Sequence, residues 1–256
     1  MRARFIFTLH VQEHLMLHYH QNLLAEWIEE IKASAEQWCH YKDYNFSSIR
    51  GQATAQQEGL TYCADCVKLI LSSPSQAFID FFIAQVFGQK SWQLGPLQLK
   101  PVRVYREPVP TFNDSVKYLC ISPLVPSFTV LKDEEAGKEL VHPAQDLFSD
   151  LLYECTIARM GQSGLYSTQD IERFSKFQLV PDQRYLRKLK KQGRLFARTH
   201  PINYQGKQYE TRTYIFPFTL YADKQVQAYV YTRGLGAFTQ QGLGMLSAQH
   251  SVADTV

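Results

Sequence analysis

Residues 234–244 read Gly-Leu-Gly-Ala-Phe-Thr-Gln-Gln-Gly-Leu-Gly, and this stretch, just before the last predicted strand, decides how the chain is interpreted. Glycine is costly inside regular structure, so two Gly-Leu-Gly triplets around a polar turn imply a sharp bend or a close approach of another group. Such a loop can present several N–H groups in one direction, which suits an anion. A tight bend at the edge of a sheet is the alternative interpretation.

The composition is that of a globular protein without a membrane span. The 256 residues allow one large domain or two of ordinary size. No apolar run approaches the roughly 20 residues that a membrane helix needs. The basic and then apolar N-terminus is broken by Thr8 and His10, so we expect a first strand in a cytoplasmic protein with no membrane partner. A net charge of +3 does not by itself indicate a nucleic-acid binder, so the clustering of charge must decide.

The cysteines do not predict a metal or redox site. They are an odd, scattered set, which is typical of reduced thiols in a cytosol. Cys63 and Cys66 form a lone Cys-x-x-Cys pair inside a strand-like run, where residues three apart point to opposite faces. We therefore expect no metal and no cofactor.

The first half of the chain alternates between strand and helix patterns. The predicted elements are a strand over 2–11, a helix over about 20–37, a short strand near 44–50, a strand over 61–71, a helix opened by Ser73-Pro74 and ended at Gly88, and a strand over 92–106. This β-α-β-β-α-β order predicts a ferredoxin-like unit.

A second series of elements follows the linker over residues 107–110. The predicted elements are a strand over 116–122, a hairpin of 128–131 with 138–141, a helix opened by Pro143, a strand over 207–220, a helix over 223–231, a last strand over 243–246 and a frayed tail over 247–256. We predict an α+β fold with two tandem ferredoxin-like (RRM-like) domains, residues 1–109 and 110–256.

The chain resembles the CRISPR repeat-processing endoribonucleases of the repeat-associated mysterious protein (RAMP) superfamily. Their last strand is preceded by a loop of the form G-φ-G-x5-G-φ-G, where φ is apolar, and Gly234, Gly236, Gly242 and Gly244 match its spacing. The resemblance spans essentially the whole chain. It implies two ferredoxin-like domains that bind CRISPR repeat RNA and cut the precursor once per repeat to give guide RNAs. The implied reaction needs no metal, because the 2′-hydroxyl attacks the phosphate and leaves a 2′,3′-cyclic phosphate and a 5′-hydroxyl.

The resemblance also implies a catalytic region after the first helix. In residues 38–47, His40 falls at the family's histidine and Lys42 at its lysine. Histidine can act as base or acid near neutral pH, and an ammonium can offset charge on the phosphate oxygens. The chain departs from the family in a shorter loop and in Glu29, which stands where a helix tyrosine is often catalytic; Tyr41 or Tyr44 would substitute.

Two alternatives stay open for the histidines. His20, in the His18-Tyr19-His20 cluster, is the second candidate for the catalytic histidine. Its other interpretation is helix entry and capping. The other interpretation of His40 is a solvated histidine that follows a helix.

RNA contacts are expected from a basic run and from the glycine-rich loop. Residues 184–198 carry seven basic and no acidic residues, and helical spacing places four of them on one stripe. Tyr185 and Phe196 would stack on bases or pack in the core. The predicted RNA-binding residues are Arg50, Arg184, Arg187, Lys188, Lys190, Lys191, Arg194, Arg233, Gly234, Gly236, Thr239, Gln240, Gly242 and Gly244.

Two other functions compete with RNA cleavage. One is a non-catalytic RAMP protein that binds guide or repeat RNA within a multi-subunit CRISPR effector complex. The other is a nucleotide-binding enzyme with Gly-Leu-Gly as its phosphate loop, which is disfavoured because the glycines precede a strand instead of opening a helix. The expected partner is CRISPR repeat RNA, with the effector complex as a further partner, and the chain is expected to be a monomer or a homodimer.

Overall fold

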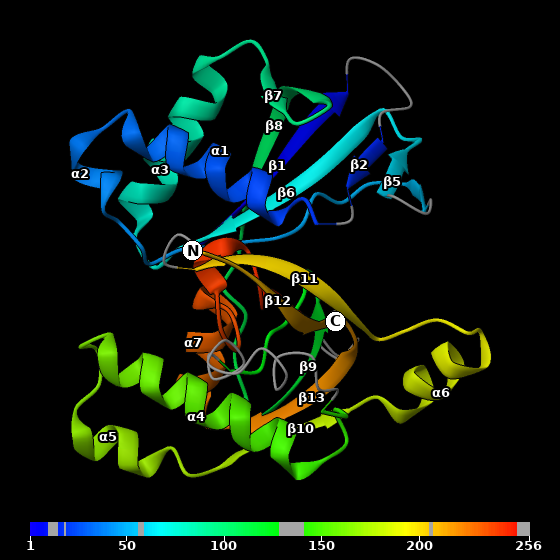
Figure 1. Ribbon diagram of the computed structural model, residues 1–256. Helices are drawn as coiled ribbons and strands as arrows, with labels where there is room; N and C mark the ends of the chain where they lie inside the picture. Colours follow the sequence, from blue (N-terminus) through cyan, green and yellow to red (C-terminus); the bar gives the residue numbers. More distant parts are fainter. Residues whose placement is uncertain (10–14, 18, 56–58, 128–140, 205–206, 250–256) are drawn as a thin grey trace, which may run out of the picture. The chain divides into compact units, whose positions relative to one another are not determined.

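The chain forms two compact units. The computed structural model describes all residues except 10–14, 18, 56–58, 128–140, 205–206 and 250–256 (Figure 1). The first unit comprises Met1–Val109 with Gln240–Gly242, and the second comprises Pro110–Thr239 with Leu243–Val256.

The first unit is built on a five-stranded antiparallel sheet in the order β3-β6-β1-β8-β7. Its strands are β1 (Arg2–Leu9), β3 (Asn45–Phe46), β6 (Cys66–Ser72), β7 (Trp92–Leu94) and β8 (Leu97–Glu107). Its helices are α1 (Gln21–Ala33), α2 (Glu36–Cys39) and α3 (Gln76–Gly88), and a small second sheet holds β2 (Leu15–Leu17), β4 (Ala53–Ala55) and β5 (Gly59–Tyr62). The strands β1, β3, β6 and β8 are the first to fourth strands of the ferredoxin-like repeat. They lie in the sheet in the order second, third, first, fourth (β3-β6-β1-β8), which is the ferredoxin-like arrangement.

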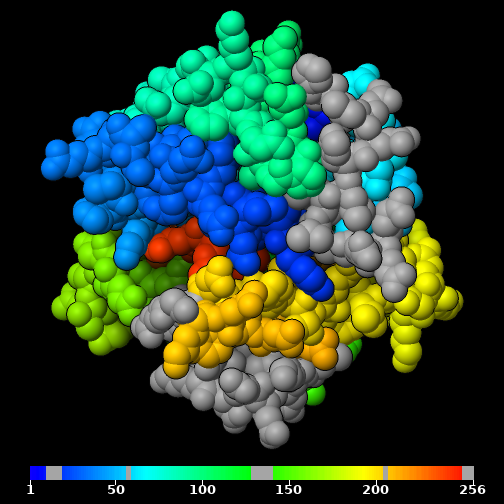
Figure 2. All heavy atoms as spheres, turned by 45° about the horizontal axis from the view of Figure 1, so that its top comes forward, coloured from blue at the N-terminus to red at the C-terminus, as the bar shows by residue number. Residues whose placement is uncertain are grey.

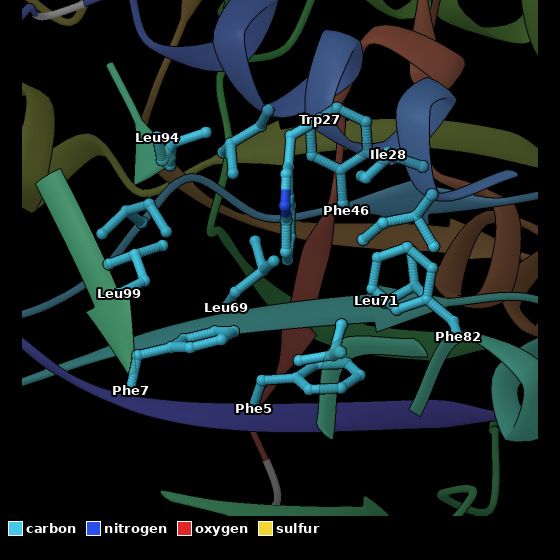
Figure 3. Packing of buried hydrophobic residues seen from close by; sticks show 14 of the residues in the cluster. Phe5, Phe7, Trp27, Ile28, Phe46, Leu69, Leu71, Phe82, Leu94 and Leu99 are labelled. Carbon is cyan, nitrogen blue, oxygen red and sulfur yellow. The ribbon is translucent and has the colours of Figure 1, made fainter. Parts of the chain in front are cut away.

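Alternation along β1 explains the core of this unit. Phe5 and Phe7 are fully buried on one face of the sheet, against α1 and α3. Figure 3 shows Trp27 of α1 above these strands, and its ring makes edge contacts with Phe7 (6.2 Å between centroids) and Phe82 (5.7 Å). Such aromatic pairs add about 0.5–1.5 kcal/mol each beyond their buried area. The core therefore holds α1, and the loop that follows it, on a rigid support.

The second unit repeats the same topology in a four-stranded sheet of order β10-β13-β9-β14. Its repeat elements are β9 (Ser115–Cys120), α4 (Asp146–Gln162), β10 (Phe177–Pro181), β13 (Pro217–Ala222), α7 (Lys224–Arg233) and β14 (Leu246–Ala248). Inserted between them are α5 (Thr168–Arg173), α6 (Gln183–Lys191) and the hairpin of β11 (Ala197–Tyr204) with β12 (Lys207–Tyr214). The prediction of two tandem ferredoxin-like domains is confirmed.

Several predicted boundaries were wrong. The helix predicted over about 20–37 is two helices, α1 and α2, and the strands predicted over 61–71 and 92–106 are each two strands, β5 with β6 and β7 with β8. The N-cap of α3 is Ser75, whose side chain accepts from the Phe78 N–H (3.2 Å), and not Ser73. The single strand predicted over 207–220 is two strands, because β12 pairs with β11 whereas β13 pairs with β10 and β9. The last strand continues to Ala248, inside the predicted tail. The hairpin predicted from residue 128 onward falls on residues 128–140, outside the described residues.

Two features are absent from the described residues. Within them, no helix is long and apolar enough to cross a membrane, and no three His, Cys, Asp or Glu residues are grouped so that they could hold a metal ion. The five cysteines form no disulfide. Burial raises the pKa of the Cys155 thiol to about 11 and that of Cys120 to about 12, so both stay protonated and unreactive near neutral pH.

Candidate functional site

The segment between α2 and β3 presents two of the predicted catalytic side chains to solvent. His40 takes the C-cap position of α2, with φ −102° and ψ 4°, and its side chain is exposed. Lys42 is exposed as well, whereas Tyr41 between them is half-buried. This segment therefore exposes a histidine and a lysine, with an anchored tyrosine between them in the sequence.

Tyr41 supplies that anchor. Its ring packs against Phe78 of α3 (4.7 Å between centroids) and Trp38 of α2 (5.3 Å). Its hydroxyl lies 2.7 Å from the Ser73 Oγ. Tyr41 is thus bound to the body of the first unit through both its ring and its hydroxyl, and its predicted catalytic role stays a prediction.

A second anchor joins the end of this segment to α1. The Tyr44 hydroxyl donates to Glu29 Oε1 (2.7 Å), and Lys32 Nζ donates to the same oxygen (2.7 Å). The Lys32 ammonium also lies 4.9 Å from the centroid of the Tyr44 ring. Burial, and then the hydrogen bond and charge of Glu29, raise the pKa of Tyr44 far above its usual value. The phenol therefore keeps its proton and acts as a hydrogen-bond donor.

Removal of the Glu29 charge is expected to destabilise the first unit by about 2–3 kcal/mol. The Lys32 side chain is only 2 % exposed, so Glu29→Gln leaves a buried ammonium without its counter-charge; the 54 % exposure of Glu29 keeps the loss at the lower end for a broken buried pair. Urea unfolding measures the loss. Glu30→Gln, an exposed neighbour on α1, is the control. Lys32→Met added to Glu29→Gln should recover most of the lost stability. Equal stability of Glu29→Gln and Glu30→Gln would contradict the role of the Glu29–Lys32 pair.

His20, the alternative catalytic histidine, is only 2 % exposed and binds a backbone group of the first unit. Its Nε2 accepts a hydrogen bond from the Ile49 N–H (3.0 Å). His20 is also the N-cap residue of α1, but its side chain makes no capping bond there. The His20 side chain therefore links α1 to the segment after β3 through this hydrogen bond, and does not make the expected capping bond.

Arg50 belongs to a basic face of the first sheet that the sequence prediction largely missed. Arg50 forms an isolated backbone bridge with Lys68, which is paired with Ile6 of β1, and Ile6 is paired with Arg103 of β8. The cations Arg50, Lys68 and Arg103 therefore lie in one row across the sheet. Burial, and then the charge of Arg4, lower the pKa of Arg50. Alternation along residues 66–72 places Lys68 on the polar face, so the sequence carries a signal for it. Alternation along 97–107 would place Arg103 on the face of the buried Leu99; Arg103 reaches the polar face because the pairing with β1 shifts register between Ile6 and Phe7.

Helix α6 carries the predicted basic run on an exposed surface. Asp182 caps the helix by accepting from the N–H groups of Arg184 (2.9 Å) and Tyr185 (3.0 Å). Leu186 and Leu189 are buried and hold the helix to the second unit. Figure 1 shows α6 standing out from the sheet, and Figure 2 shows the side chains of this yellow segment extending into solvent. The exposed cations of the run are Arg184, Arg187, Lys188, Lys190, Lys191, Arg194 and Arg198.

The aromatic residues of this run pack against the core of the second unit. Tyr185 and Phe196 are both half-buried against the core of the second unit. The Phe196 ring stacks on Tyr214 (6.4 Å between centroids) and meets the His142 ring edge-on (5.3 Å). Core packing therefore accounts for Phe196, and the exposed part of this run holds its cations together with the exposed Leu195.

The glycine-rich loop is mostly buried. Residues 234–239 and 242–244 are buried, and Gln240 is exposed. The N–H groups of Leu235 and Ala237 donate to the carbonyls of Gly244 and Val125 (2.8 Å each), and the Gly244 N–H donates to the Pro123 carbonyl (2.6 Å). These N–H groups are used inside the second unit, so they do not form the anion-binding loop that the sequence suggested.

Positive φ angles and close backbone contacts explain why glycine occupies this loop. Gly236 has φ 79° and Gly244 has φ 70°, and a Cβ at either position would overlap a backbone carbonyl oxygen, that of Val125 or of Leu235. Gly234 and Gly242 also have positive φ. The loop is therefore a close-packed turn that returns the chain to its last strand.

Arg159 of α4 organises the same loop. Its guanidinium donates to the carbonyls of Arg233 (3.0 Å), Gly234 (2.9 Å) and Gly236 (2.8 Å). It also donates to the Thr239 hydroxyl (2.9 Å). The Thr239 side chain, a predicted RNA contact, thus has a partner within the protein. Arg233 is half-buried, and its guanidinium lies 5.1 Å from the Tyr229 ring centroid. Of the RNA-binding residues predicted in this region, Gln240 is exposed and Arg233 is half-buried.

Comparisons with known proteins identify the family of this arrangement. The family model described as CRISPR associated protein Cas6, C-terminal, matches residues 105–248. No curated protein matches the chain in sequence.

Solved structures share the fold over nearly the whole chain. The chain is similar to a structure described as CRISPR associated protein Cas6, with 17% identity, a TM-score of 0.72 and coverage of 98% of this chain and 99% of that one. It is also similar to an RAMP protein binding different RNA substrates, at 15% identity, TM-score 0.72 and coverage of 98% and 100%. The product of a Cas6-related gene from Pyrococcus furiosus has 14% identity, TM-score 0.74 and coverage of 98% and 98%.

Proposed function

The chain belongs to the family of CRISPR associated protein Cas6, and from this premise we propose that it is a metal-independent endoribonuclease that cuts CRISPR repeat RNA. The observation that carries the proposal is the exposure of His40 and Lys42 on either side of the anchored Tyr41. The product of the cut is a guide RNA released from the precursor transcript.

RNA brings its own nucleophile to this site. The 2′-hydroxyl beside the scissile phosphate attacks in line and expels the 5′-oxygen, giving a 2′,3′-cyclic phosphate and a 5′-hydroxyl. His40 exchanges a proton with the attacking or the leaving oxygen, and the Lys42 ammonium stabilises the negative charge that develops on the phosphate. The exposed cations of α6 bind the RNA backbone.

Cleavage of repeat RNA with and without a chelator tests this function. We expect full cleavage in excess EDTA and a product that carries a cyclic phosphate. A repeat RNA with a 2′-deoxy sugar at the scissile position should bind equally well and stay intact. Tight binding without any cyclic-phosphate product would favour a non-catalytic RNA-binding subunit instead.

Lys188→Ala with Lys191→Ala is expected to weaken RNA binding and to reduce its dependence on salt. Both side chains are exposed on α6, and each phosphate contact that is lost lowers the slope of log K against log salt by about 0.7–0.9. Fluorescence anisotropy at several salt concentrations measures the slope. Lys90→Ala, an exposed lysine of the first unit, is the matched control. An unchanged slope in the double variant would show that α6 does not contact the RNA.

A further inference from the structure

Ser73 lies between β6 and α3, and its hydroxyl is hydrogen-bonded to three separate groups. The Ser73 Oγ donates to the Asp43 carbonyl (2.9 Å) and accepts from the Ser75 N–H (3.1 Å). It lies 2.7 Å from the Tyr41 hydroxyl oxygen. Ser73 is fully buried, so these bonds are made away from solvent.

The hydrogen-bonding capacity of a hydroxyl fixes the direction of each bond. A serine hydroxyl has one proton and two acceptor lone pairs. Its proton goes to the Asp43 carbonyl, because a carbonyl oxygen can only accept, and the Ser75 N–H takes one lone pair. Tyr41 must therefore donate its hydroxyl proton to the remaining lone pair of Ser73. All three bonds of the Ser73 hydroxyl are made, and the Tyr41 proton is committed to one of them.

Tyr41 directly follows His40, and Tyr41 and Asp43 flank Lys42, so Ser73 holds the segment that carries both predicted catalytic groups. We propose, on the basis of the proposed function, that Ser73 is a positioning residue for RNA cleavage. It fixes the Tyr41 side chain and the Asp43 carbonyl, and thereby sets where His40 and Lys42 stand. Tyr41 acts in this arrangement as an anchor and transfers no proton in the reaction.

The test compares Ser73→Ala with Ser75→Ala. Misplacement of a catalytic group by about 1 Å can cost up to 10²-fold in rate, so we expect Ser73→Ala to slow single-turnover cleavage at saturating protein by about 10-fold or more. Its affinity for repeat RNA should stay within about 2-fold, because the side chain is buried. Ser75→Ala removes the N-cap of α3, at a typical cost of about 1 kcal/mol of stability, because its side chain accepts from the Phe78 N–H of α3 itself; the Ser75 N–H that donates to the Ser73 Oγ remains. This variant should cleave at the wild-type rate, and a wild-type rate for Ser73→Ala would overturn the proposal.

Tyr41→Phe separates positioning from proton transfer. If Tyr41 is only an anchor, Tyr41→Phe should slow cleavage no more than Ser73→Ala does and should keep the wild-type shape of the pH–rate profile. The double variant Ser73→Ala with Tyr41→Phe should then cleave no more slowly than Ser73→Ala alone. A proton-transfer role for Tyr41 would instead cost about 10²–10⁴-fold and remove one limb of the profile. That result would overturn the anchor role.

Amide hydrogen exchange over residues 40–44 judges the role of Ser73 without reference to cleavage. Ser73→Ala should speed exchange in this segment, and Ser75→Ala should not. If the wild-type protein binds repeat RNA and leaves it uncut, the proposed function fails, while faster exchange in Ser73→Ala still shows that Ser73 holds the segment. Unchanged exchange would overturn that role.

Discussion

A protein with His40→Ala is expected to bind repeat RNA as tightly as the wild type and to cut it about 10²–10⁴-fold more slowly. The His40 side chain is exposed at the end of α2, so its removal leaves no cavity in the core and no buried group without a partner. The loss should therefore fall on the cleavage rate and not on stability or affinity. Single-turnover cleavage, anisotropy and thermal unfolding measure the three quantities separately.

His20→Ala is the matched histidine variant. Because His20 is buried and accepts from the Ile49 N–H, its removal should lower the melting temperature by several degrees. Full cleavage by His40→Ala together with a stable but inactive His20→Ala would exchange the two assignments. The pair of variants thus decides between the two histidines that the sequence left open.

Gly244→Ala is expected to destabilise the second unit by about 3 kcal/mol or more. Residue 244 has φ 70°, which L side chains rarely adopt, and its new Cβ would overlap the Leu235 carbonyl oxygen. Neither backbone can move without breaking the hydrogen bond from the Leu235 N–H to the Gly244 carbonyl (2.8 Å). Urea unfolding, followed by a probe in the second unit, measures the effect.

Gly164→Ala isolates the part of this loss that comes from crowding. Gly164 has nearly the same φ of 68°, but a Cβ there would meet nothing within 4 Å. It should cost only the strain of the left-handed conformation, about 1–2 kcal/mol. Equal losses at the two positions would mean that the close approach of Gly244 and Leu235 contributes nothing.

The parts of the fold that the sequence predicted are those with a local signal. Alternation over residues 2–11 predicted β1, and the helix predicted over 223–231 is α7, for which the structure shows Asp223 as the N-cap. The break between β12 and β13 has no such signal, because the alternation runs through it and only the pairing partners change. Helix α5 did have a signal that was missed, namely the capping box of Ser167 with Asp170.

The candidate site divides in the same way. Residue type and resemblance pointed to His40, Lys42 and the cations of α6, and the structure leaves these side chains exposed. Spacing along the chain does not show that Ser73 lies against Tyr41 or that Arg159 reaches the glycine-rich loop, because these contacts join distant segments. The loop matches a family pattern, and in this chain its Leu235, Ala237 and Gly244 N–H groups are bonded to backbone carbonyls of the second unit.

The strand order of the second unit also sets an order of events during synthesis. Its central strand β9 needs β13 and β14 as neighbours, and the Met245 N–H donates to the Ser122 Oγ, 123 residues earlier. Pairing over such separations is slow, because loop closure must precede any gain from contacts. All strands of the first sheet have been synthesised once the chain has reached Glu107. The edge of β9 that pairs with β14 stays unpaired until Leu246–Ala248 have been synthesised. The glycine-rich loop makes the turn that brings β14 to β9. Substitutions in this loop should therefore change the rate of a slow refolding step of the second unit.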